Sequence, residues 1–412
     1  MGGGLHGRWT AVTRAWRGLG RAQLALLMGG FLVNVGTFAV YPYLAVLLRE
    51  RLDAGMAQVG VVLGAATLLQ FASAPFTAAF AERVGLKRAL SLATCLYCLG
   101  ALTYLGGADR PALMVLGLFL SCGAGALYSP AYRGYLVHAA TDEQRPRLVS
   151  AGSAAGQLGI ACGPVVGALF LHEPGRLFAV TTALYALLAL GHAALRPEEP
   201  VRPALSGPAV EPFSRVLHGL ARVPFAATVL THYLFMQFYQ YLSVYAEGRL
   251  STAVYGLAMT GYSLGLAVLQ PLVARRVGRA GHPAAMAIGF PAMAVGMAAF
   301  ATGHAAGVAC GAAAMSVGTA VLFLKNDLEA LALSERSATV TFGQQRLAVG
   351  VGALLSGVIG GAVYGMFERA DALGAFWLTV AAQCVLLPPL ALVAGRLVRG
   401  RRTAPRSAPR PG

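Results

Sequence analysis

The sequence predicts an all-α integral membrane protein with twelve transmembrane helices in two pseudo-symmetric six-helix bundles. Hydrophobic residues make up 57% and charged residues 12% of the 412 positions, and the mean hydropathy is +0.64. A soluble chain of this length could not bury so much apolar surface. The division into two halves is predicted by an internal repeat. Ala81-Glu82-Arg83-Val84-Gly85 recurs 193 positions later as Ala274-Arg275-Arg276-Val277-Gly278, and Gly156, Gly163 and Gly167 recur 194 positions later as Gly350, Gly357 and Gly361.

Twelve apolar segments are long enough to cross a hydrocarbon layer of about 30 Å. In chain order they are predicted at residues 22–48, 57–80, 89–107, 111–138, 148–171, 175–195, 223–246, 253–274, 283–303, 306–331, 339–365 and 372–396. Glycine, with 52 residues, and alanine are abundant in them. Such small side chains let neighbouring membrane helices approach closely.

The longest connection between segments lies at the midpoint of the chain. Residues 196–222 are polar and rich in proline, and we interpret them as a cytoplasmic linker. Residues 1–195 then form the N-terminal bundle and residues 223–396 the C-terminal bundle. The arginine-rich residues 397–412 are predicted to be a disordered basic cytoplasmic tail.

The net charge of +16 would fit a nucleic-acid-binding protein, but the placement of the basic residues argues against that class. In the twelve-span arrangement, about 23 Lys and Arg residues lie on one side of the membrane and about 6 on the other. Cytoplasmic loops carry such an excess. We therefore expect a multi-pass protein of the plasma membrane, surrounded by the lipid bilayer, with both termini in the cytoplasm and no nucleic-acid partner.

The connection between the second and third segments carries a carboxylate and three cations around a glycine. These five residues, which we call the clasp, are Glu82, Arg83, Gly85, Lys87 and Arg88. A charge cluster at this place can link the two bundles in one conformation and release them in the other. An ordinary basic cytoplasmic loop is the alternative interpretation.

This connection resembles the signature loop of the major facilitator superfamily, which reads Gly-x-Leu-Ala-Asp-Arg-x-Gly-Arg-Lys-x-x-Leu. The chain matches it at Ala81, Arg83, Gly85, Lys87 and Leu90, and departs from it at Ala78, Phe80, Glu82 and Leu86. The resemblance covers about residues 20–396. It implies a transporter whose two bundles rock about a substrate site between them.

The fifth segment carries four residues of a second motif, Gly159, Gly163, Pro164 and Gly167. The glycines make a smooth face for packing and the proline removes a backbone hydrogen bond, so we interpret the motif as a pivot. A packing face with a tolerated kink is the alternative. The pattern GxxxGPxxG is similar to the signature of the twelve-helix drug–proton antiporter branch, which implies export. Many members of that branch also carry an arginine in the middle of helix four, whereas residues 118–125 contain none.

The seventh segment has an unusual density of aromatic and amide side chains at residues 231–241. Phe, Tyr and Met make adaptable contacts with large apolar or cationic ligands, so we predict that this segment lines the substrate cavity. An interfacial belt of tyrosines is the alternative. The predicted cavity residues are Asn34, Tyr41, Gln70, Gln157, His232, Phe235, Gln237, Tyr239 and Tyr262.

Ionisable side chains inside a membrane are expensive and are candidates for function. Burial disfavours the charged form of a carboxylate, which allows such an acid to exchange protons. The candidate proton-coupling residues are Asp327, Glu329, Arg346, Arg133 and His232. Lys325 and Glu329 are spaced to pair along one helix face, and a structural salt-bridge network at the cytoplasmic end is the alternative for this group.

We therefore expect a secondary active transporter that exports a small amphipathic or cationic compound in exchange for protons by alternating access. Uptake by proton symport is the alternative on the same fold. A membrane-embedded enzyme would need clustered His, Asp or Cys at one membrane face, and the eight histidines are scattered. A sensor would need a large soluble domain, which is not apparent in the sequence. We expect a monomer that is not an enzyme and uses no cofactor. We also expect no metal, because all six cysteines lie in apolar segments.

Overall fold

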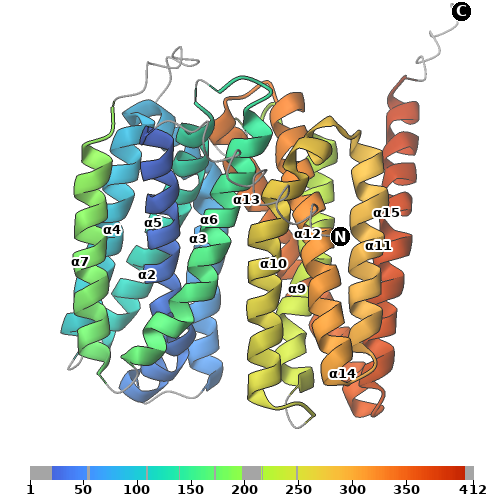
Figure 1. Cartoon of the computed structure of the whole chain (residues 1–412), viewed down its shortest axis with the longest axis horizontal. Coiled ribbons are helices and arrows are strands. Elements are labelled where there is room, and N and C mark those ends of the chain that lie inside the picture. The colour runs from blue at the N-terminus through green and yellow to red at the C-terminus, as the bar shows by residue number, and fades with distance from the viewer. Residues whose placement is uncertain are drawn as a thin grey trace, which may run out of the picture.

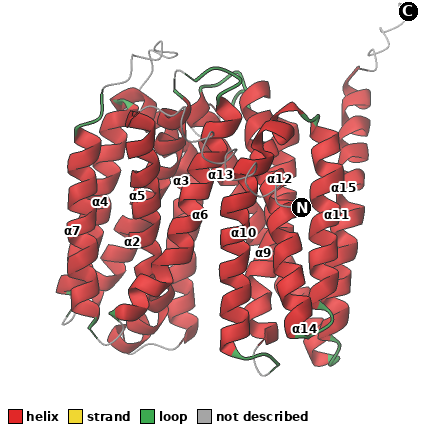
Figure 2. Cartoon of the chain, viewed as in Figure 1, coloured by secondary structure: helices red, strands yellow, loops and turns green. Residues whose placement is uncertain are grey.

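The structure is a computed structural model that describes residues 21–52, 56–107, 110–138, 140–170, 173–196, 215, 217–246 and 249–403. Regular structure in these residues is entirely helical (Figure 2). Most of the predicted linker and residues 404–412 of the predicted tail lie outside the described residues.

Six helices from the first half of the chain stand side by side, coloured blue to green in Figure 1. They are α2 (Arg21–Leu52), α3 (Met56–Val84), α4 (Leu86–Gly106), α5 (Pro111–Val137), α6 (Arg145–Leu169) and α7 (Pro174–Ala193). The second half forms six further rods, one of which consists of three consecutive pieces. They are α9 (Arg222–Ala246), α10 (Thr252–Arg279), α11 (His282–Phe300), α12 (Ala305–Leu333), α13 (Ala338–Leu355) continued by the π-helix η1 (Ser356–Gly360) and α14 (Gly361–Arg369), and α15 (Leu373–Thr403).

The described part of the chain thus has twelve rods where the sequence predicts twelve spans. Ten candidate spans in it are both long enough and apolar enough to cross a membrane. Several boundaries differ by a few residues, and the largest difference is at the end of α15. This helix continues to Thr403, so residues 397–403 of the segment predicted to be disordered are helical. Leucine and arginine favour helix, and the first proline after the predicted span is Pro405.

Each bundle has an apolar interior, and its outer surface is apolar as well. In the C-terminal bundle Phe376 and Trp377 are fully buried and pack edge to face. In the N-terminal bundle Tyr97 stacks on Tyr185, with 4.9 Å between the ring centroids. Large aliphatic side chains point outward on the outer helices, among them Leu187, Leu190, Leu257, Val295 and Leu390. Such a surface is stable against lipid and not against water.

The two bundles meet mainly along two helix pairs, α3 with α13 and α6 with α10, and α5 also contacts α13. We call one end of the molecule the basic end. It carries the α3–α4, α5–α6, α10–α11 and α12–α13 connections, and the basic residues Arg83, Lys87, Arg88, Arg145, Arg147, Arg275, Arg276, Arg279 and Arg336.

Close contacts between the bundles lie toward the basic end. A Cβ atom on Gly343 of α13 would lie 2.6 Å from the Cβ of Ala78 on α3. A Cβ atom on Gly278 of α10 would lie 2.9 Å from the ring of Pro146 on α6. Glycine at these two positions therefore lets the backbones approach, and the bundles close on each other at this end.

The two sequence motifs have defined local structures. Gly85 stands between α3 and α4 with φ of 92°, a left-handed backbone that side chains other than glycine rarely adopt. Gly159 and Gly163 of α6 face α2, where added Cβ atoms would collide with the backbone of Phe31 and Phe38. The glycine motif is thus a packing face within the N-terminal bundle.

Candidate functional site

An ion pair crosses the interface between the two bundles. Nη1 of Arg133 on α5 donates to Oδ2 of Asp327 on α12 at 2.5 Å. The side chains are 32% and 14% exposed, and the guanidinium also lies 5.5 Å from the centroid of the Phe342 ring on α13. The two residues are 194 positions apart, which equals the repeat offset. Each is therefore the counterpart of the other, and their contact lies on the pseudo-two-fold axis relating the bundles.

A second arginine lies next to this pair. Arg346 of α13 places its guanidinium 4.8 Å from the centroid of Phe71 on α3. Arg133, Asp327 and Tyr97 are all within electrostatic range of it. Because α13 begins at Ala338 and a helix rises about 1.5 Å per residue, Arg346 lies roughly two turns from the basic end. It therefore approaches the middle of the membrane-spanning part.

His232 and Glu329 have partners of their own. The His232 ring stacks on Phe323 with centroids 4.6 Å apart, and its Nδ1 is 3.0 Å from the carbonyl oxygen of Thr228. Oε2 of Glu329 pairs with Nζ of Lys325 at 3.1 Å within α12. The structure therefore brings Arg133, Asp327 and Arg346 together, with His232 near them, whereas Glu329 is paired along its own helix as its spacing suggests.

The aromatic residues predicted on α9 form a ring cluster. Phe235 lies 5.8 Å from Tyr262 of α10 and 5.4 Å from Phe323 of α12, measured between centroids. Tyr239 follows one turn later, 5.8 Å from Phe235, and is 42% exposed. Gln237 points elsewhere. It is fully buried, and its Nε2 donates to Oε1 of Gln383 on α15 at 3.2 Å, so in this conformation its amide faces the interior of its own bundle.

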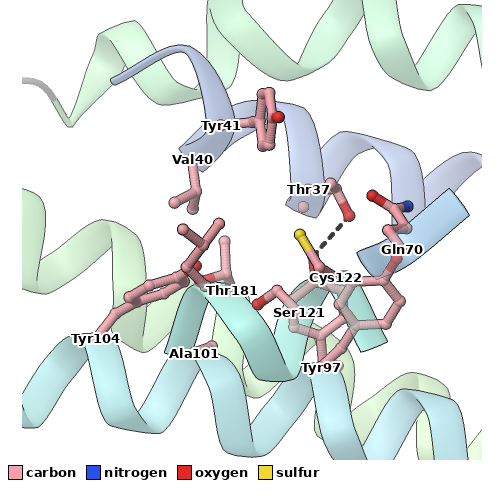
Figure 3. A pocket seen from close by; sticks show the side chains of 13 residues that line it. Thr37, Val40, Tyr41, Gln70, Tyr97, Ala101, Tyr104, Ser121, Cys122 and Thr181 are labelled. Atoms are coloured by element: carbon pink, nitrogen blue, oxygen red, sulfur yellow. Dashed lines mark hydrogen bonds between the residues drawn. The ribbon is translucent and has the colours of Figure 1, made fainter. Parts of the chain in front are cut away.

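The N-terminal bundle contains a small pocket of about 50 Å³ (Figure 3). Tyr41 and Gln70, both predicted cavity residues, line it together with hydroxyl-bearing residues. Thr37 and Tyr185 share a hydrogen bond of 3.2 Å across it, and Tyr41 is bonded to Thr67 at 3.1 Å. This volume holds a few water molecules and not a drug-sized compound.

The remaining predicted residues lie away from this centre. Nδ2 of Asn34 donates to the carbonyl of Gly30 at 2.8 Å within α2, and Gln157 is half-buried on α6. In the clasp, Glu82 and Lys87 are half-buried and Arg88 is exposed. Both terminal nitrogens of Arg83 are buried without a hydrogen-bond partner among the described residues.

Sequence reasoning missed the aromatic partners of the two arginines. Phe342 lies four residues before Arg346 on α13, and no pattern of polar residues in the sequence marks it. Phe71 lies beside Gln70, which the sequence did single out. An arginine within an apolar span is itself a signal to look for a facing aromatic ring. The described residues contain no group of three or more His, Cys, Asp or Glu that could hold a metal ion.

A family model described as Major Facilitator Superfamily matches residues 26–253. The multidrug resistance protein MdtH of Salmonella typhi is 29% identical over 210 residues, which are 51% of this chain and 52% of that protein. An uncharacterised MFS-type transporter of Mycobacterium tuberculosis is 29% identical over 184 residues, 44% of this chain and 43% of the relative. The chain spans about half the length of the curated relatives it matches.

Two solved structures have the same fold. The human organic anion transporter MFSD10 superposes with a TM-score of 0.71 at 17% identity, covering 89% of this chain and 97% of that one. The Major Facilitator Superfamily transporter FucP, in the outward conformation, superposes with a TM-score of 0.70 at 16% identity, covering 88% of this chain and 96% of that one.

Proposed function

Because the chain belongs to the Major Facilitator Superfamily, we propose that this transporter exports a small amphipathic compound in exchange for protons by alternating access. The similarity to the multidrug resistance protein MdtH over half of the chain supports export. The observation that carries the proposal is the ion pair between Arg133 and Asp327, because it joins the two bundles and includes a carboxylate.

Alternating access requires that the contacts at the basic end break and re-form. The excess of Lys and Arg favours a cytoplasmic position for this end, and on this proposal the described conformation is the one closed toward the cytoplasm. Opening it separates α5 from α12 and α13, and thereby breaks the pair of Arg133 with Asp327. The ion pair thus stabilises one of the two alternating states.

Protonation of Asp327 is the proposed coupling step. A neutral carboxyl group no longer attracts Arg133, so a proton entering from the outside weakens closure at the basic end. Once that end opens, the proton leaves to the cytoplasm and cargo binds. The recovered carboxylate then pairs with Arg133 and closes the basic end again. The ionisable groups that face Asp327 are Arg133 and Arg346. His232 lies near the two arginines, and Lys325 and Glu329 pair with each other along the same helix.

Cargo is proposed to contact the aromatic rings that face the interface. Phe235 and Tyr239 offer broad apolar faces, and the hydroxyl group of Tyr239 lies at the edge of its ring. Tyr262 is buried and packs behind Phe235. Such rings accept ligands of varied shape, because stacking has few directional demands. This supports an amphipathic cargo.

The test is proton movement in liposomes that contain the purified full-length protein, screened with dyes, antibiotics and sugars. Antiport predicts that an added substrate on one side drives protons to that side, whereas uptake by symport predicts movement of the opposite sign. Asp327→Asn should abolish this proton movement while substrate exchange without a gradient continues. Asp142→Asn, which alters a 91%-exposed carboxylate in the α5–α6 connection, is the matched control. Normal proton coupling in Asp327→Asn would refute the assignment of this carboxylate.

A further inference from the structure

The charges of the three residues Arg133, Asp327 and Arg346 do not balance. Arg133 and Arg346 contribute two positive charges, and Asp327 contributes one negative charge. Asp327 is hydrogen-bonded to Arg133, and among the described residues no ion pair includes Arg346. One guanidinium therefore carries an uncompensated charge in the membrane-spanning part of the protein.

An uncompensated charge at this place is costly. Arginine does not lose its proton in proteins, and a charge within the hydrocarbon region is retained where it has a partner or a function. The ring of Phe71 offsets part of the cost, since its face attracts the cation at 4.8 Å. A ring accepts no in-plane hydrogen bond, so the planar fork of N–H donors is left for another acceptor.

The surroundings of Arg346 suit an anion better than a cation. Tyr97 is near it and also lines the N-terminal pocket, as does Gln70, the neighbour of Phe71 in sequence. The pocket lining contains hydroxyl groups, an amide and no carboxylate. A cationic group placed here would face two arginines, whose only described opposing charge is the carboxylate already bonded to Arg133.

We infer that the cargo carries an anionic group, such as a carboxylate, which binds the guanidinium of Arg346. This inference rests on the proposed function, because it takes the interface to be the cargo site. The fork of an arginine matches the two oxygens of a carboxylate in a bidentate contact. Phe235 and Tyr239 then contact the apolar part of the same molecule. The cargo is an amphipathic anion and not the cationic compound that the aromatic residues alone suggest.

Three probes with one fluorophore and different charges test this inference: dansylglycine, its neutral methyl ester, and the cationic dansylcadaverine. Binding to the purified full-length protein is followed by dansyl fluorescence, and uptake into proteoliposomes is measured with the same compounds. We expect dansylglycine to bind most tightly. Replacing Arg346 by Gln should weaken its binding by about ten- to a hundredfold, the range of a charged hydrogen bond, while the ester changes by less than about threefold.

Two further variants separate charge from folding. Arg346→Lys keeps the charge without the fork and should retain part of the preference for dansylglycine. Arg369→Gln removes an exposed arginine at the far end of the same rod and should leave the preference unchanged. If wild-type protein does not discriminate among the three probes, or if Arg346→Gln keeps the wild-type preference, the inference is overturned. Failure of the proposed function would instead appear in the proton assay, where no added compound would drive proton movement.

Discussion

Arg133 and Arg346 lie in neighbouring layers of one interface, the layer of Arg133 nearer the basic end and the layer of Arg346 nearer the middle. The two arginines have opposite kinds of surroundings. Arg133 faces Asp327, its own counterpart in the other bundle, at 2.5 Å. The counterpart of Arg346, 194 positions earlier, is Gly152 of α6, which contributes no charge. Arg346 has the ring of Phe71 and, among the described residues, no ion pair.

This difference suggests that the two layers have different functions. A pair that is complete within the protein can stabilise a conformation, but it offers little to a ligand. A cation that is incomplete within the protein can bind a ligand, but it cannot hold the bundles together. We therefore propose that the layer nearer the basic end serves closure and that the layer nearer the middle serves binding.

The largest effect is expected when Asp327 is replaced by alanine, because both arginines then lack a carboxylate. Removing one partner of a fully buried pair costs about 3–5 kcal/mol, and the one-third exposure of Arg133 lowers this to roughly 1–3 kcal/mol. Thermal unfolding in detergent should show the loss of stability, and proton-driven transport should be undetectable. The double variant Arg133→Leu/Asp327→Leu should unfold near the wild-type temperature, still without coupling. Equal stability of the alanine variant and the wild type would show that the ion pair does not stabilise the closed conformation.

A bulky residue at Gly134 should disturb closure without touching a charge. A Cβ atom here would collide with the Thr339 side chain of α13, so Gly134→Val should wedge the basic end apart at a cost of about 1–3 kcal/mol. Spin labels at residues 88 and 275, on opposite bundles, should report a longer distance, and transport should fall about tenfold, the equivalent of roughly 1.4 kcal/mol. Gly123→Val on the same helix, where nothing lies within 4 Å of the added Cβ, is the control. An unchanged distance in Gly134→Val would contradict a closing role for this contact.

The aromatic rings that contact the two arginines, Phe71 and Phe342, should contribute differently to stability. Phe71→Leu removes the main described contact of Arg346 and should cost about 1–2 kcal/mol of stability. Phe342→Leu should cost less, because Arg133 keeps Asp327. Double-mutant cycles with Arg346→Gln and Arg133→Gln measure the two couplings by thermal unfolding. A coupling of Arg133 with Phe342 as large as that of Arg346 with Phe71 would remove the distinction between the layers.

The smallest effect is expected for the pair within α12. Lys325→Gln/Glu329→Gln removes two charges that pair along one helix at 3.1 Å and do not cross the interface. Because both charges of a buried pair are removed together and neither is left without a partner, we expect a change of less than about 1 kcal/mol in stability. We expect a transport rate within about twofold of wild type, measured in the same liposomes. Loss of proton coupling in this variant would transfer the role proposed for Asp327 to Glu329.

The sequence predicts the fold well because lipid imposes simple rules. A span needs about 20 apolar residues, and the two repeats mark the halves, so the twelve rods and their pairing into bundles could be anticipated. The end of α15 could not, since a helix that leaves the membrane continues until a residue such as proline stops it. Gly85 was also predictable, because a single residue between two long helices must turn the chain sharply, and glycine tolerates the positive φ found there.

The site was predictable as a set of residues and not as an arrangement. Ionisable residues within spans identify Arg133, Asp327 and Arg346, but their contacts depend on how α5, α12 and α13 pack. Gln237 shows the limit of reasoning by residue type. Its amide lies on the helix that carries the ring cluster, yet helical rotation turns it toward Gln383 and away from Phe235. Periodicity assigns residues to faces only relative to one another, and the neighbours decide what each face meets.

The π-helix at Ser356–Gly360 limits how far the two halves of the chain can be compared. An i→i+5 turn accommodates one additional residue, which rotates everything beyond it by about 100° relative to an uninterrupted α-helix. Gly357, the counterpart of Gly163, lies within this stretch. Up to that point, numbering by the offset matches equivalent faces in α6 and α13. Beyond it, equal numbering no longer means equal orientation, so a role found for a residue after Gly163 does not transfer to its counterpart in α14.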